Sequence, residues 1–86
     1  MSAKEMFEEL GYEYQKNNNI LNYHLEQNDS KGVQMRFGIF FNLDYKYYHT
    51  YAYGLFENGK PYDSYLSIDI KIHKAINKQI EELGWK

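Results

Sequence analysis

The sequence predicts a two-layer α+β domain with the element order α-β-β-β-β-α. Both ends of the 86-residue chain carry apolar residues at helical spacing, and each of these segments closes on a glycine. Between them, apolar and polar residues alternate, which is typical of half-buried strands. Short turn-forming segments separate the strands and favour an antiparallel meander. We therefore expect one domain over residues 1–86, a four-stranded antiparallel meander with the N- and C-terminal helices on one face.

The N-terminal segment has a complete set of helix signals. Ser2 and Glu5 match the capping box, in which each side chain satisfies a backbone donor at the helix entry. One helical face then carries the apolar residues Ala3, Met6, Phe7 and Leu10. Gly11 can adopt the left-handed conformation that ends a helix, so we expect Tyr12 to fold back on Phe7.

The C-terminal segment repeats this pattern. Ser67 or Asp69 can cap a helix that begins nearby. Its predicted buried stripe consists of Ile72, Ala75, Ile76, Ile80 and Leu83. Gly84 ends the helix, and Trp85 is expected to pack on Ile80. The acidic pairs 8–9 and 81–82 lie at the negative ends of the two helix dipoles, which costs a few tenths of a kcal/mol, up to about 1. Either capping and packing outweigh this cost or the pairs contact a partner.

The central region divides into strands at its turn residues. Tyr12 and Tyr14 face one way in a short first strand, and residues 16–19 form an asparagine-rich turn. The second strand places Leu21, Tyr23 and Leu25 on one side and Asn22, His24 and Glu26 on the other. A turn over 28–32 leads to the third strand, 33–43, where apolar residues alternate without a break.

The second half of the sheet is expected to turn back at Asp44 and Tyr45 into a fourth strand over about 46–56. Residues 57–60 carry the Asn-Gly hairpin signal. After them, Pro61 allows either a brief edge strand or an irregular connection.

The register of the last two long strands decides which aromatic residues stay uncovered. A two-residue turn pairs Phe41 with Tyr48 and places Tyr51 opposite Gly38, where a ring can cover bare backbone. A turn one residue longer would exchange the two faces. With the two-residue turn, the face away from the helices presents the candidate binding residues Arg36, Phe40, Tyr47, His49, Tyr51 and Tyr53.

Three interpretations fit this surface. Tyrosine is a good strand former and tolerates a half-wet surface, so the rings need no function. The rings can instead form a protein interface, either with a second copy or with a host protein, because Tyr and Arg are enriched at interface hot spots. They can also stack on a nucleotide or nucleic acid, with Arg36, Lys46 or His49 contacting phosphate. The net charge of −2 and the sparse cations favour the protein interface over nucleic acid.

Other chemistries have weaker support. The chain has no cysteine, which excludes disulfides and thiolate metal sites. Its histidines fall in three separate elements and lack zinc-helix spacing, and Ser64 and Ser67 have no recognisable base. Asp69 and His73 are better explained as a surface ion pair than as metal ligands. We expect no enzyme activity, no cofactor and no metal. Without a membrane-length apolar run or a secretory signal, we expect a cytoplasmic protein.

The two ends also carry a resemblance. The run AINKQIEELGW at 75–85 resembles the ending of small uncharacterised proteins encoded by phages and prophages of Gram-positive bacteria. The start MFEELGY at 6–12 is similar to the start of the same proteins. The tyrosine-rich fourth strand and the segment 58–61 depart from them. The resemblance implies an accessory phage protein that acts by binding, for instance by blocking a host defence or replication protein.

Overall fold

The computed structural model describes residues 1–28, 34–55, 61–63 and 66–85. Its helices are α1 (Ala3–Glu9) and α2 (Ile70–Leu83). Its strands are β1 (Glu13–Asn17), β2 (Ile20–Asn28), β3 (Gln34–Asn42), β4 (Tyr47–Leu55) and β5 (Pro61–Asp63). The predicted turn at 28–32 and the predicted Asn-Gly hairpin fall mostly outside these ranges.

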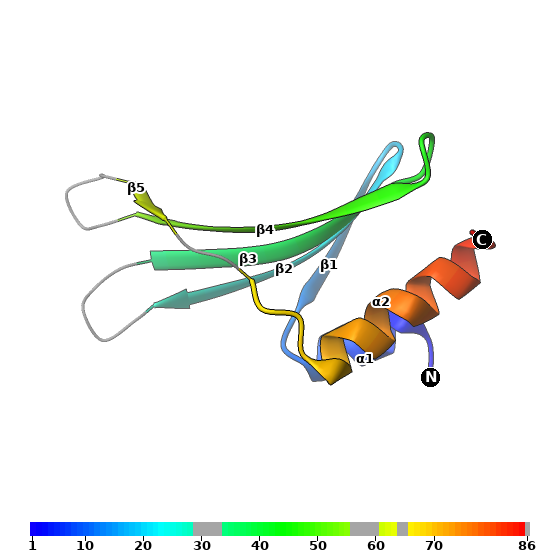
Figure 1. The fold of residues 1–86 in the computed structure, drawn as a ribbon, viewed down its shortest axis with the longest axis horizontal. Coiled ribbons are helices and arrows are strands. Elements are labelled where there is room, and N and C mark those ends of the chain that lie inside the picture. The colour runs from blue at the N-terminus through cyan, green and yellow to red at the C-terminus, as the bar shows by residue number, and fades with distance from the viewer. Residues whose placement is uncertain (29–33, 56–60, 64–65, 86) are drawn as a thin grey trace.

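The described strands form one antiparallel sheet in the order β1-β2-β3-β4-β5. Both helices lie on the same face of this sheet, and the other face is open (Figure 1). This arrangement confirms the predicted α+β class and the meander of four strands between two helices. The three-residue β5 adds a short strand beside β4, which is one of the two outcomes left open after Pro61.

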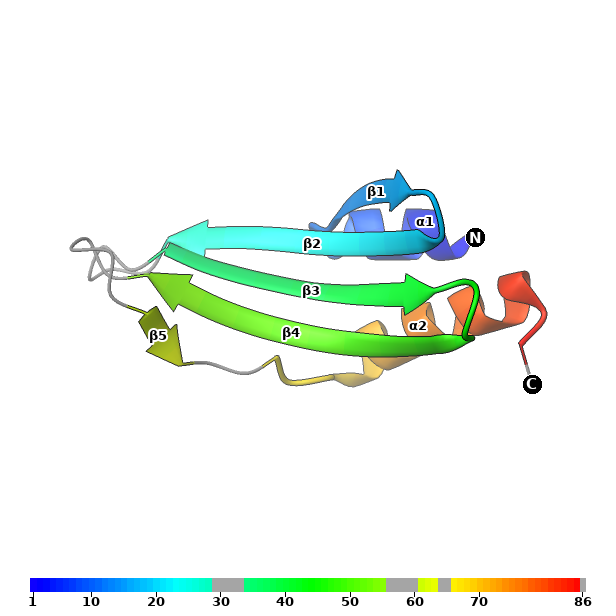
Figure 2. The ribbon, with the colours of Figure 1, turned by 90° about the horizontal axis from the view of Figure 1, so that it is seen from above.

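The helices cover only part of the sheet. Viewed from above, they lie behind the half that contains β1 and the β3–β4 turn, while the other ends of β2, β3 and β4 extend past them (Figure 2). The molecule is accordingly elongated, with extents of 43 × 24 × 18 Å. The part of the sheet that extends past the helices is therefore not covered by the helical layer.

The helix ends follow the predicted chemistry. Ser2 and Glu5 form the capping box of α1, and Asp69 caps α2 by accepting a 2.8 Å hydrogen bond from the Ile72 N–H. Gly11 and Gly84 have φ values of 93° and 74°, and the residues after them donate backbone hydrogen bonds to Phe7 and Ile80. The Asp69 carboxylate therefore works as a cap. The ion pair with His73 expected from the sequence is not among those found in the described residues.

The two acidic pairs are partly explained by contacts within the chain. The Glu82 carboxylate accepts a 2.8 Å hydrogen bond from the Ala3 N–H, at the positive end of α1. Glu81 lies 3.9 Å from Lys78. Glu82 thus links the end of α2 to the start of α1, a favourable contact that offsets its position at the negative end of its own helix.

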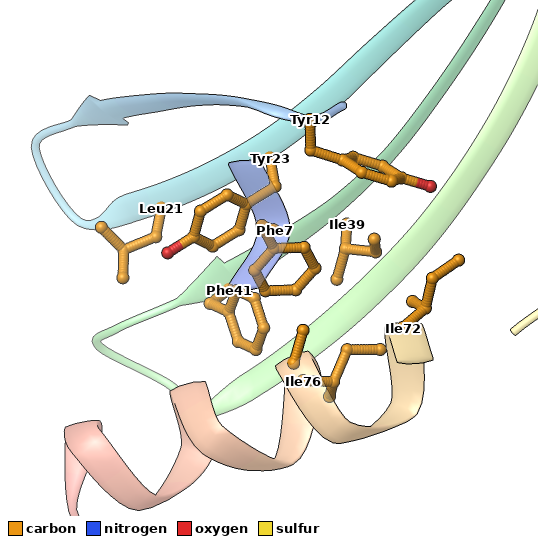
Figure 3. Close-up of a cluster of buried hydrophobic side chains, with 9 residues drawn as sticks. Phe7, Tyr12, Leu21, Tyr23, Ile39, Phe41, Ile72 and Ile76 are labelled. Atoms are coloured by element: carbon orange, nitrogen blue, oxygen red, sulfur yellow. The ribbon is translucent and has the colours of Figure 1, made fainter. Parts of the chain in front are cut away.

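The core lies between the helices and the covered half of the sheet (Figure 3). The Phe7 ring stacks on Tyr23 with centroids 3.9 Å apart, and Phe41 meets Tyr23 edge-on. The predicted apolar residues of both helices face this cluster. Its buried members are Phe7, Tyr12, Leu21, Tyr23, Ile39, Phe41, Ile72, Ala75 and Ile76. Trp85 reaches the same cluster through Phe41, at 6.2 Å between centroids.

Two turns that are held by side-chain hydrogen bonds set the register of the sheet. The β1–β2 turn consists of Asn18 and Asn19, so residues 16 and 17 belong to β1 and not to the turn as expected. The β3–β4 reversal spans 43–46, and the Asn42 side chain accepts hydrogen bonds from the N–H groups of Asp44 and Tyr45 at 3.1 and 2.9 Å. Asn19 donates a 2.7 Å hydrogen bond to the Asp44 carboxylate. These bonds hold the predicted register of β3 against β4.

Candidate functional site

The open face of the sheet gathers the six predicted binding residues. In β3 and β4, Phe41 pairs with Tyr48 and Gly38 with Tyr51, as the two-residue turn predicts. Because Ile39 and Phe41 are buried against the helices, the side chains between them point the opposite way. The face away from the helices therefore presents Arg36, Phe40, Tyr47, His49, Tyr51 and Tyr53.

Five of these residues form one connected set of rings, which we call the aromatic face: Phe40, Tyr47, His49, Tyr51 and Tyr53. Phe40 stacks on His49 at 5.4 Å between centroids and also contacts Tyr47 and Tyr51, each at 6.4 Å. Tyr47 meets His49 edge-on at 5.3 Å, and Tyr51 stacks on Tyr53 at 6.1 Å. Each ring thus limits the rotamers of its neighbour before any partner binds.

The rings differ in how far they are exposed. Tyr47 is 41% exposed and Tyr53 48% exposed. His49 is also exposed, whereas Phe40 and Tyr51 are half-buried. Two exposed tyrosines therefore lie at the ends of the aromatic face, and the half-buried Phe40 and Tyr51 lie between them.

Tyr51 has a structural role as well. Its ring lies over Gly38 so closely that a Cβ atom at Gly38 would overlap it. Its hydroxyl donates a 3.2 Å hydrogen bond to the side-chain oxygen of Asn22 on β2. Tyr51 is therefore held across three strands and forms the fixed centre of the aromatic face.

Arg36 is tied into a polar cluster beside the rings. Its Nε lies 3.7 Å from Glu26 Oε1, and its terminal nitrogen lies 3.5 Å from His24. A hydrogen bond with the Tyr53 hydroxyl raises the pKa of Arg36, and the Glu26 carboxylate acts in the same direction. His24 in turn lies 4.0 Å from the Glu13 carboxylate. Contacts with Glu13 and Arg36 on the neighbouring strands therefore account for His24 and Glu26.

The polar half of this face was not assigned a role from the sequence. The β2–β3 register places Glu26 directly opposite Arg36, and Asn22 opposite Phe40. That pairing could have been derived by extending the register argument one strand further. A cavity of about 500 Å³ adjoins the cluster at the uncovered end of the sheet, where Glu26, Arg36 and Tyr53 contribute to its lining.

A second cavity, of about 630 Å³, lies between β4 and the end of α2. It is lined by Lys46, Tyr47, Tyr48, Ile80, Gly84 and Trp85. Tyr47 joins this cavity to the aromatic face, and Tyr48 is 43% exposed although it points toward the helix side. The helical layer therefore does not fully cover the start of β4.

In the described part of the chain no group of three or more His, Asp or Glu side chains is placed to hold a metal ion. No helix there is long and apolar enough to cross a membrane. Ser67 is exposed in the connection to α2, and Ser64 lies outside the described residues. No family model, curated protein or solved structure matches this chain.

Proposed function

We propose that the chain is a non-catalytic binding protein whose aromatic face binds another protein. The observation that carries the proposal is the set of five contacting rings on the uncovered side of the sheet, two of them more than 40% exposed. Exposed aromatic patches of this kind mark interaction sites, and Tyr is enriched among interface hot spots.

The rings are already ordered in the free chain, which favours binding. Ordering a side chain at an interface costs about 0.5–1.5 kcal/mol for each flexible residue. Tyr51 is fixed over Gly38, and its stacked neighbours limit one another. Much of that ordering is complete before a partner arrives, so more of the contact energy remains as affinity.

The charges on this face favour a protein over a polyanion. Among the described residues of β1–β4 whose side chains point away from the helices, Arg36 is the only Lys or Arg. Glu26 and Tyr53 already interact with its side chain. Glu13 and Glu26 add negative charge to the same face. Phosphate recognition depends on cations that are free to pair with it. The nucleotide and nucleic-acid alternative therefore has less support than the protein partner.

The partner class comes from the resemblance of the two chain ends to phage and prophage proteins. On that basis we propose that the partner is a host protein in the bacterial cytoplasm. Binding inhibits this protein, either to block a host defence or to support takeover of the host. The amphipathic character of the face suits such a partner, since an aromatic band over β3 and β4 adjoins a polar band over β1 and β2.

Affinity capture from a lysate of the bacterial host tests this proposal. The double variant Tyr47→Ser/Tyr53→Ser removes the two exposed tyrosine rings of the face and should reduce capture of a specific protein by about tenfold or more. The matched control is Tyr45→Ser, because Tyr45 is 79% exposed on the β3–β4 turn and lies off the aromatic face. This control should capture the same protein as the unmodified chain.

Two results would contradict the proposal. One is equal capture by the double variant, once circular dichroism shows that it is folded. The other is a thermal shift of the free protein with a panel of linear and cyclic nucleotides, because a bound ligand raises stability by mass action. That second result would favour the nucleotide alternative on the same surface.

A further inference from the structure

One edge of β4 has few pairing partners. Among the described residues, β5 pairs with Tyr53–Leu55, and no strand pairs with the stretch 47–52 on that side. Residues 66–69, which lead into α2, run past this side without forming a strand (Figure 2). Among the described residues, no backbone hydrogen bond reaches this stretch from outside the β3–β4 pair. Alternate residues of such a strand direct their N–H and C=O groups outward, where another strand can pair with them.

This open edge lacks the features that usually block strand pairing. Its sequence, YYHTYA, contains no Lys, Arg, Asp, Glu or Pro. The strand at the opposite edge of the sheet, β1, carries Glu13 and Lys16 within five residues. The two edges therefore differ in chemistry, and the β4 edge is the one suited to pairing.

We propose that residues 48–52 pair with the same stretch of a second copy, antiparallel and about a two-fold axis at Thr50, so that the two Thr50 residues lie opposite each other. The sheets of the two subunits then form one continuous sheet. An antiparallel pair of identical strands obeys the symmetry of a dimer, in which each contact occurs twice. The proposal uses the backbone of β4 and does not depend on the function proposed for the aromatic face.

The chemistry of the stretch favours a second copy over an unrelated strand. Self-pairing brings no like charges together, since the stretch carries no Asp, Glu, Lys or Arg. It places His49 beside Tyr51 of the second copy on the face away from the helices, because these two residues share that side. Aromatic cross-strand pairs stabilise strand pairing.

The monomer exposes 6094 Å², against about 5,400 Å² for a compact chain of 10.4 kDa, because its sheet extends past the helices. A two-fold axis perpendicular to the sheet keeps both aromatic faces on the same side, so dimerisation would double the surface available to a partner.

Sedimentation equilibrium of the full chain tests the dimer. We expect a mass twice that of the 10.4 kDa chain. Thr50 is exposed, lies at the proposed axis and points away from the aromatic face. Thr50→Lys brings two like charges together and should weaken association by about tenfold or more, as should Thr50→Glu. Mixing the two variants should restore dimers, because the opposite charges then meet.

The mixing step separates repulsion from misfolding, since two unfolded variants would not restore a dimer. Gln15→Lys is the matched control, because it places the same charge on an exposed residue of the opposite edge strand. It should leave the dimer intact. A monomeric unmodified chain at high concentration would overturn the proposal. So would a dimer that Thr50→Lys leaves unchanged, or one that Gln15→Lys dissociates equally.

Discussion

The Tyr23 hydroxyl donates a 2.5 Å hydrogen bond to Oε1 of Gln79, which joins the middle of the sheet to α2 inside the core. Tyr23 is 1% exposed and Gln79 5% exposed. A buried polar pair stabilises the fold only when both partners are satisfied, because an unsatisfied buried group retains its desolvation cost. The hydrogen bond between Tyr23 and Gln79 therefore also fixes the position of α2 relative to β2.

Tyr23→Phe should lower the free energy of unfolding by about 1–3 kcal/mol, because it leaves the Gln79 amide oxygen buried without its donor. Urea unfolding at neutral pH measures this change. The double variant Tyr23→Phe/Gln79→Met removes both polar groups and should recover part of the loss. A Tyr23→Phe variant as stable as the unmodified chain would show that Gln79 finds another donor.

Stability should fall at alkaline pH. Burial raises the pKa of the Tyr23 phenol above its ordinary value of 10.0, and the same cause raises the pKa of Tyr12. The folded state thus retains a proton that the unfolded chain releases. The associated stability is complete below about pH 10 and decreases as the pH rises toward the folded-state pKa. Urea unfolding from about pH 9 to 11 should show this decrease, and the slope should be smaller in Tyr23→Phe.

Gly38→Ala tests the contact at the centre of the aromatic face. The new methyl group would overlap the Tyr51 ring, so the ring must move or the strands must separate. We expect a loss of about 1–3 kcal/mol in the free energy of unfolding, as for other overpacked sites. By itself, Tyr51→Ser should lower the free energy of unfolding. In the double variant it should reduce the loss that Gly38→Ala causes. Additive losses in this double-mutant cycle would argue against the contact.

The sequence was sufficient for both helices, the long strands and an uncovered sheet face because each depends on local patterns. The capping residues, the glycines after both helices and the unbroken alternation in β3 act over a few residues. These features need no knowledge of the rest of the molecule. The sequence allowed two registers at the Asp44–Tyr45 turn, and the structure has the one that pairs Gly38 with Tyr51.

The remaining features depend on tertiary geometry. Gln79 lies on the same face of α2 as the predicted apolar stripe, but its burial could not be predicted because it depends on the hydrogen bond from Tyr23. The bond from Ala3 to Glu82 joins residues at opposite ends of the chain. The open β4 edge depends on how few residues of β5 pair with it. Periodic patterns in the sequence do not predict these contacts between distant residues.

The start of α2 offers a test between the two caps that the sequence left open. Asp69 accepts the Ile72 N–H, whereas Ser67 lies two residues outside the cap and is exposed. Asp69→Ala should therefore lower the free energy of unfolding by about 1 kcal/mol. Ser67→Ala should leave it unchanged within about 0.5 kcal/mol. Thermal unfolding followed by circular dichroism measures both variants. An equal loss in the two would mean that α2 begins earlier in solution than at Ile70.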